Sequence, residues 1–178
     1  MNRLAECPPN VGFGVGETVQ ACTKGLWIRK ELIQIAPGKW AIYMDTEGID
    51  ALDASSDGDV RIFTLALLLS SVFMYNSTGH IDEAAMNTLT LMTRVAERLT
   101  STLPDGDKLA EHMPTFVWVL RDFSLRLEDR TGAALSNEAY LESALAPCEG
   151  AAASKNATRE LLRSNFAQRH LVTLPRPS

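Results

Sequence analysis

Apolar runs alternate with polar segments along the chain, and this pattern predicts strands that alternate with helices. Runs of strand length and composition lie at 26–35, 40–44, 71–75, 115–120 and 170–174. Pro37 and Gly38 separate the first two runs, which predicts a hairpin whose second strand is buried. Segments with helical spacing or a capping residue lie at 60–70, 81–99, 136–145 and 155–166. This alternation predicts an α/β fold with a mostly parallel sheet.

Three local patterns refine this prediction. Apolar residues spaced three or four apart predict the buried face of a helix in the 81–99 segment: Ala85, Leu89, Met92, Ala96 and Leu99. Ser136 is expected to cap the helix at 136–145, although Ala139 stands where a capping box has Glu. The polar residues at 76–79 predict a turn, and the acidic stretch at 50–59 predicts a surface loop.

Composition narrows the class of protein. The chain has 178 residues, of which 46% are hydrophobic and 22% charged, as expected for one globular domain. Its formal net charge of -5 argues against binding to a nucleic-acid polymer. The three cysteines show no metal-binding spacing, which favours free thiols in a reducing compartment. We find neither a signal peptide nor an apolar run long enough to span a membrane.

Two of the predicted strands are followed by acidic residues. Asp45 begins the pattern D-x-x-G, which ends at Gly48, and Asp122 follows the strand at 115–120. In parallel α/β sheets, ligands bind beyond the carboxyl ends of strands. An aspartate there can hold Mg²⁺, and a glycine three residues later lets the backbone approach a terminal phosphate. Asp122 can accept hydrogen bonds from N1–H and the exocyclic amine of guanine.

Ordinary structural roles remain open for the same residues. D-x-x-G also arises from turn chemistry, which favours Asp and Gly. Thr23 can complete a Mg²⁺ shell with its hydroxyl, or it can be a residue of the turn that enters the first strand. Asp122 can read a base edge, or it can act as a cap or pair with Arg121.

Over nearly its whole length the sequence resembles the guanylate-binding protein family of large GTPases, which are dynamin-like and related to the atlastins. The resemblance is strongest in four ordered blocks at 12–27, 44–48, 62–77 and 116–125. It implies a three-layer P-loop-NTPase-like GTPase domain, with a mostly parallel sheet and helices on both faces. It also implies GTP and GDP as ligands, Mg²⁺ as cofactor, and a homodimer formed through the GTPase face.

The resemblance assigns roles to individual residues. Thr23 corresponds to the switch threonine that binds Mg²⁺ and contributes to catalysis, and Asp45 to the Mg²⁺-linked aspartate. Glu47 corresponds to the glutamate that organises the attacking water, and Gly48 to the glycine that faces the γ-phosphate. Arg121 and Asp122 correspond to the Arg-Asp guanine-recognition motif. The segments at 147–154 and 170–174 fall where the family has its guanine cap.

The sequence departs from the family pattern at the phosphate site. It contains no G-x-x-x-x-G-K-[ST], the pattern whose backbone and lysine hold the phosphates. Ala21 stands where many members carry a serine that positions the catalytic water. We therefore expect residues 1–178 to be a partial GTPase domain, running from the first switch to the last strand, that lacks the first strand and the P-loop.

These departures leave three hypotheses. The first is a GTPase whose GTP binding and hydrolysis are impaired in this chain. The second is a non-catalytic pseudo-GTPase that serves as an interaction or dimerisation module. The third is an unrelated α/β domain in which Asp45 and Asp122 are turn residues. The resemblance implies a cytoplasmic location, with membrane association only through regions of the full-length protein outside this sequence.

Overall fold

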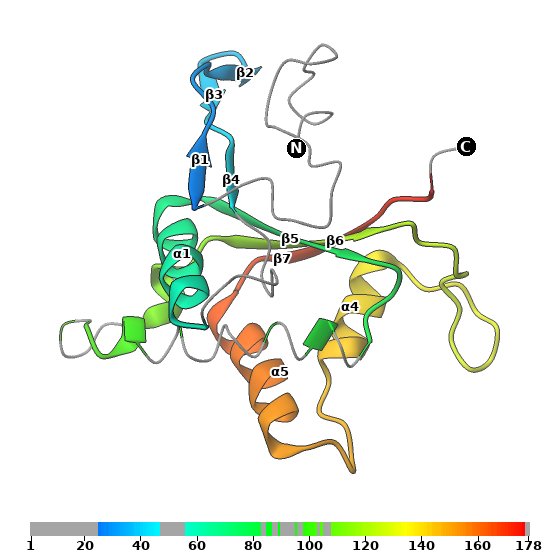
Figure 1. The fold of residues 1–178 in the computed structure, drawn as a ribbon. Coiled ribbons are helices and arrows are strands. Elements are labelled where there is room, and N and C mark those ends of the chain that lie inside the picture. Colours follow the sequence, from blue (N-terminus) through cyan, green and yellow to red (C-terminus); the bar gives the residue numbers. More distant parts are fainter. Residues whose placement is uncertain are drawn as a thin grey trace. The chain divides into compact units, whose positions relative to one another are not determined.

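The computed structural model describes residues 25–46, 56–82, 85–86, 89, 95, 98–102, 104 and 108–176. The chain divides into two compact units, Met1–Ala66 and Leu67–Ser178. Figure 1 labels helices and strands of both units. No helix among the described residues is long and apolar enough to cross a membrane.

The described strands of the first unit form the predicted hairpin. Strand β1 (Leu26–Ile28) pairs antiparallel with β4 (Met44–Thr46), and β2 (Ile33–Ala36) pairs antiparallel with β3 (Lys39–Ala41). Gly38 turns the chain between β2 and β3 with φ of 72°, a left-handed conformation that glycine adopts without steric cost. Each of the two predicted strands is therefore divided into two short strands, and these form two separate antiparallel pairs.

The prediction that the strand at 40–44 is buried is wrong. Trp40 is 58% exposed and Ile42 is 59% exposed. Within the described part of this unit, β2 and β3 form a two-stranded ribbon. Such a ribbon has no second layer to cover its apolar side chains. The apolar pattern predicted the strands correctly but not their burial.

Helix α1 (Ser56–Leu69) confirms the helix predicted at 60–70 and begins four residues earlier. The loop predicted at 50–59 is therefore wrong from Ser56 onward, and residues 50–55 lie outside the described part of the chain. Serine and aspartate favour helix N-termini, where they complement unpaired backbone N–H groups, so the same residues suit a loop or a helix start.

The second unit contains a three-stranded parallel sheet in the order β5-β6-β7. Its strands are β5 (Val72–Thr78), β6 (Thr115–Arg121) and β7 (Arg169–Thr173), which confirm the strands predicted at 71–75, 115–120 and 170–174. The turn predicted at 76–79 is wrong for its first three residues, because β5 continues through Thr78 in register with Arg121. The chain turns at Gly79, where φ is 79°.

Two helices cover one face of this sheet. Helix α4 (Asn137–Leu145) packs against β7, and α5 (Ala153–Asn165) lies on the same side (Figure 1). The Phe116 ring lies 5.1 Å from that of Phe166, measured between centroids. The core of the second unit includes residues with no exposed surface: Leu89, Val95, Phe116, Trp118, Leu120, Leu141, Leu145, Leu162 and Phe166. A helix on the opposite face stays a prediction.

The predicted helix stripe at 81–99 is partly described. Leu89 and Leu99 are buried as expected, and Met86 and Val95 are buried with them. Met92 and Ala96 lie outside the described residues. The short helix η1 (Leu109–Glu111) then leads into β6.

Polar contacts fix the two helices to β7. The Ser136 Oγ accepts a hydrogen bond from the Ala139 N–H at 3.1 Å, which confirms the predicted cap of α4. The Arg169 guanidinium donates to both carboxylate oxygens of Glu142 at 2.6 and 2.8 Å. It also donates to the carbonyls of Arg163 and Phe166 at the C-terminal end of α5. The hydrogen bond from Arg169 lowers the pKa of Glu142.

Candidate functional site

The candidate site of the second unit lies at the carboxyl ends of its parallel strands. Asp122 follows β6, the central strand, and its neighbours across the sheet are the ends of β5 and β7 (Figure 1). Ligands of parallel α/β sheets bind beyond this edge. The structure therefore places Asp122 where the sequence predicted a ligand contact.

The backbone of Asp122 is held in an unusual conformation. Its φ is 55°, the only positive φ at a residue other than glycine in the described part of the chain. This left-handed region costs an L-residue about 1–2 kcal/mol, although Asp tolerates it better than most. The residues on both sides are anchored: the Arg121 carbonyl accepts from the Gly79 N–H at 2.7 Å, and the Phe123 N–H donates to the Leu174 carbonyl at 3.0 Å. The sheet thus imposes the turn that presents Asp122.

The Arg121 side chain is directed to strand β5. Its Nε donates to Oδ1 of Asn76 at 2.9 Å, and its Nη2 donates to Oγ1 of Thr78 at 3.4 Å. The side chain of Asp122 is exposed. Among the described residues, no hydrogen bond or ion pair joins Arg121 to the Asp122 carboxylate. The alternative in which Asp122 pairs with Arg121 is therefore absent from this structure.

A third contact joins the same two strands on the other face of the sheet. The buried Trp118 indole donates from Nε1 to the Ser77 Oγ at 2.9 Å. Asn76, Ser77 and Thr78 are thus three consecutive residues of β5 that accept hydrogen bonds from side chains of β6. Sequence reasoning assigned them to a turn. The sequence signal that could have identified them as acceptors is a run of polar residues directly after a buried strand.

The other predicted site residues belong to the first unit. Asp45 is half-buried in β4, where it lies opposite Trp27 of β1. The prediction that Asp45 follows a strand is wrong, because it is the middle residue of β4 in an antiparallel pair. Its carboxylate is of the oxygen chemistry that Mg²⁺ requires. Thr23, Glu47 and Gly48 lie outside the described residues. Within the described ranges, no three His, Cys, Asp or Glu side chains gather as a metal site. Mg²⁺ ligation and the roles of these four residues stay predictions.

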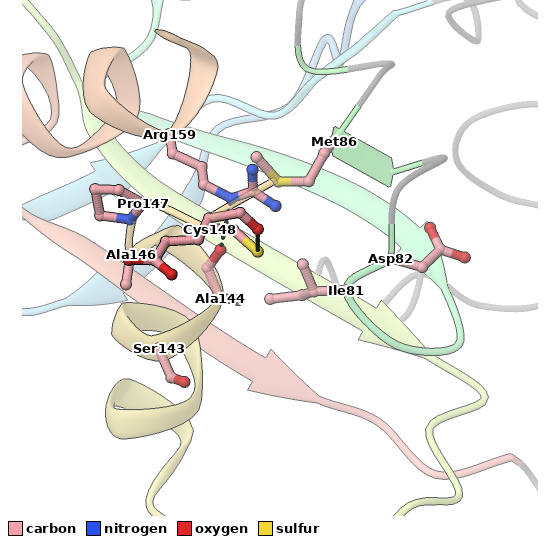
Figure 2. A pocket seen from close by; sticks show the side chains of 10 residues that line it. Ile81, Asp82, Met86, Ser143, Ala144, Ala146, Pro147, Cys148 and Arg159 are labelled. Carbon is pink, nitrogen blue, oxygen red and sulfur yellow. Dashed lines mark hydrogen bonds between the residues drawn. The ribbon is translucent and has the colours of Figure 1, made fainter. Parts of the chain in front are cut away.

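A cavity of about 550 Å³ lies elsewhere in the second unit, between the end of α4 and α5 (Figure 2). The buried Arg159 lies along one side and donates from Nε to the Ala144 carbonyl at 3.2 Å. The Asn156 side chain holds the loop beside it through both the N–H and the carbonyl of Cys148, at 3.1 Å each. Neither Arg121 nor Asp122 lines this cavity, so it is separate from the candidate site.

The fold and this site define an α/β protein with a candidate ligand site at the carboxyl edge of a parallel sheet. The sequence model of the family described as guanylate-binding protein, N-terminal domain, matches residues 1–178. The chain belongs to the guanylate-binding protein family.

Individual relatives agree with this family. Guanylate-binding protein 2 of Mus musculus is 36% identical over 189 residues, which cover 100% of this chain and 32% of the relative. Guanylate-binding protein 5 of Homo sapiens is 40% identical over 158 residues, which cover 84% of this chain and 26% of the relative. Guanylate-binding protein 1 of Homo sapiens is 35% identical over 190 residues, which cover 99% of this chain and 32% of the relative. The chain thus spans about a third of the length of the curated relatives it matches.

Proposed function

We propose that this chain carries the base-recognition part of a guanine-nucleotide site in a protein that binds and hydrolyses GTP. The observation that supports this most is the exposed Asp122 carboxylate, presented at the carboxyl edge of the sheet by a left-handed backbone. Two carboxylate oxygens can accept the N1–H and the exocyclic amine of guanine together. Membership of the guanylate-binding protein family supports the choice of guanine.

The proposed hydrolysis assigns the remaining residues to the phosphate end of the nucleotide. Phosphoryl transfer is catalysed mainly by positioning and charge stabilisation. When bound, Mg²⁺ neutralises charge on the phosphates. In this proposal, Thr23 and Asp45 hold the metal, Gly48 lets its backbone N–H approach the γ-phosphate, and Glu47 orients the attacking water.

We further propose that nucleotide binding by these residues alone is weak. The sequence of residues 1–178 contains no G-x-x-x-x-G-K-[ST], so it supplies no P-loop lysine or amide cradle. Each charge-assisted hydrogen bond to a phosphate contributes about 1.5–3 kcal/mol. Each tenfold change in affinity corresponds to about 1.4 kcal/mol, so the loss of three such bonds lowers the affinity by three or more powers of ten.

A non-catalytic interaction module is the alternative. Ala21 has no hydroxyl at the position where many family members carry a serine. Absence of a P-loop pattern upstream of this chain in the full-length protein would favour the module. A GTPase assay on the full-length protein that contains this chain separates the two: Mg²⁺-dependent phosphate release supports the enzyme. A concentration-dependent dimer without phosphate release supports the module. Homodimerisation and membrane association belong to this full-length protein in the proposal.

The test of base recognition compares GDP with its xanthine analogue, XDP. We expect a ¹H–¹⁵N NMR titration of the chain to show weak binding that favours GDP, and Asp122→Asn to reverse the preference. The Asn amide can donate to the 2-carbonyl of xanthine, which the carboxylate repels. Glu138→Gln, which neutralises another exposed acid, is the matched control. An unchanged preference in Asp122→Asn contradicts base recognition, and micromolar GTP binding by wild type contradicts the proposed weakness.

A further inference from the structure

We propose that Asn76 and Thr78 are positioning residues for base recognition: they hold the Arg121 guanidinium on β5 and thereby leave the Asp122 carboxylate open to the nucleobase. This inference rests on the proposed function of Asp122. It assigns a role to two residues of a neighbouring strand that are far from Asp122 in the sequence.

The register of the sheet brings these groups together. Thr78 lies directly opposite Arg121 in the parallel ladder, and Asn76 lies two residues earlier. Side chains two residues apart on a strand project from the same face. Asn76 therefore receives the Nε–H of Arg121 at 2.9 Å and Thr78 receives Nη2 at 3.4 Å. The guanidinium is fixed at two points along the edge of β5.

Both acceptors are neutral groups that hold Arg121 through hydrogen bonds. An Asn carbonyl and a Thr hydroxyl orient the cation without cancelling its charge. Arg121 and Asp122 are consecutive, so a released guanidinium can fold back and form a two-point ion pair with the carboxylate. That pair would occupy the same two oxygens that guanine requires. Holding Arg121 on β5 prevents this competition.

The neighbouring contacts stabilise the arrangement. Trp118 is fully buried, and its indole donates to Ser77, the residue between Asn76 and Thr78. Directly after Thr78, the Gly79 N–H donates to the Arg121 carbonyl at 2.7 Å. The end of β5 is thereby fixed to the end of β6, and the two acceptors face Arg121 in one register.

The experiment measures the preference for GDP over IDP, the inosine analogue that lacks the exocyclic amine. This ratio reports whether both Asp122 oxygens reach the base, and a general loss of stability does not change it. We expect Asn76→Val to lower the ratio by roughly tenfold to a hundredfold, the range for one hydrogen bond to a charged group. Thr78→Val should lower it less, because its contact is longer. Asn76→Asp keeps an acceptor for Arg121 and should preserve the ratio.

Two further measurements complete the design. The Arg121 Nε–H resonance should move in Asn76→Val and remain near its wild-type position in Asn76→Asp. Thr115→Val is the matched control, because it removes the Thr115–Gln168 hydrogen bond of 3.0 Å at the opposite end of β6. It should change neither the ratio nor the resonance.

The outcomes separate this inference from the proposed function. If Asp122→Asn fails to reverse the preference between GDP and XDP, base recognition itself is wrong. If Asp122→Asn reverses it but Asn76→Val and Thr78→Val keep the wild-type GDP to IDP ratio, only the positioning role is overturned. A loss in Asn76→Asp as large as in Asn76→Val also overturns it. Should Asn76→Val fail to fold, Thr78→Val decides: an unchanged ratio counts against the inference.

Discussion

Asp122 combines a sterically disfavoured backbone with a side chain that carries the proposed recognition. The φ of 55° limits which residues fit, because a branched side chain collides with the backbone in this region. Aspartate and asparagine are the residues other than glycine that tolerate it best. The position therefore restricts substitutions for a conformational reason that is independent of nucleotide binding.

This restriction predicts a difference in stability between two substitutions of Asp122. We expect Asp122→Val to lower the free energy of unfolding by about 1–2 kcal/mol, because valine is β-branched and strained at positive φ. Asp122→Asn should remain within about 0.5 kcal/mol of wild type. Urea denaturation of the chain measures both. Equal stability of the two variants would show that the left-handed backbone is not retained in solution.

Ser77 provides a second prediction at the scale of one residue. Ser77→Ala removes the acceptor of the Trp118 indole N–H, which is fully buried. A buried donor without a partner costs about 1–3 kcal/mol, so we expect a loss of this size in urea denaturation. Ser164→Ala is the matched control, because the Ser164 hydroxyl is exposed and donates only within α5. Similar losses in the two variants would contradict the importance of the Trp118 contact.

Arg169 is the residue through which α4, α5 and β7 are joined. Its guanidinium reaches Glu142 on α4 and two carbonyls at the end of α5, from its own place at the start of β7. A guanidinium at a helix C-terminus also complements the negative end of the helix dipole. One side chain thus fixes the relative positions of three elements that carry the core.

The Glu142–Arg169 pair predicts a dependence of stability on pH. The hydrogen bond from Arg169 holds the pKa of Glu142 below its ordinary value of 4.5. The pair therefore stabilises the folded state fully above pH 4.5, and this contribution is lost as pH falls through the lower pKa of the folded state. Glu142 is 44% exposed, so we expect Glu142→Gln to cost only about 0.5–1 kcal/mol at neutral pH.

Denaturation of wild type and Glu142→Gln across the acid range tests this prediction. The difference in unfolding free energy should be constant at neutral pH and should shrink as Glu142 becomes protonated. A difference that persists unchanged in acid would show that packing, and not the ion pair, is responsible.

The elements that could be predicted from the sequence are those whose signal is local. The run at 116–120 is apolar throughout because β6 is the central strand. The Ser136 hydroxyl caps α4 by accepting from the N–H three residues later in the sequence. The end of β5 could not be predicted in this way. Its polar residues are typical of turns, and they remain in a strand because β6 supplies the backbone and side-chain partners.

The candidate site also combines features with a local sequence signal and features that depend on contacts distant in the sequence. The position of Asp122 at the carboxyl edge of the sheet was predictable because it directly follows a buried strand, whereas its role stays a prediction. Its left-handed backbone and the hydrogen bonds of Arg121 depend on the register between β5 and β6, which brings together Asn76 and Arg121, 45 positions apart in the sequence. Burial of Trp40 was mispredicted for a related reason, because an apolar side chain indicates no particular partner.

At the scale of the whole molecule, residues 1–178 offer a candidate contact for the base of a nucleotide but no P-loop pattern for its phosphates. The second unit presents a carboxylate suited to a base, on a backbone held at positive φ, and the neighbouring Arg121 side chain is hydrogen-bonded to β5. In the proposed function, the phosphate end is assigned to residues 23 and 45–48, and residues 1–178 contain no P-loop pattern. The base should therefore supply most of the binding energy in this chain.

This imbalance predicts that affinity is nearly independent of the number of phosphates. We expect guanosine, GDP and GTP to bind the 178-residue chain with dissociation constants within about tenfold of one another in the presence of Mg²⁺, because each missing phosphate contact forgoes about 1.5–3 kcal/mol. NMR titrations that follow the Trp118 indole and Asp122 amide resonances measure all three. Asp45→Asn should leave guanosine binding unchanged. Affinity that rises a thousandfold from guanosine to GTP would show that these residues build a phosphate site without the P-loop pattern.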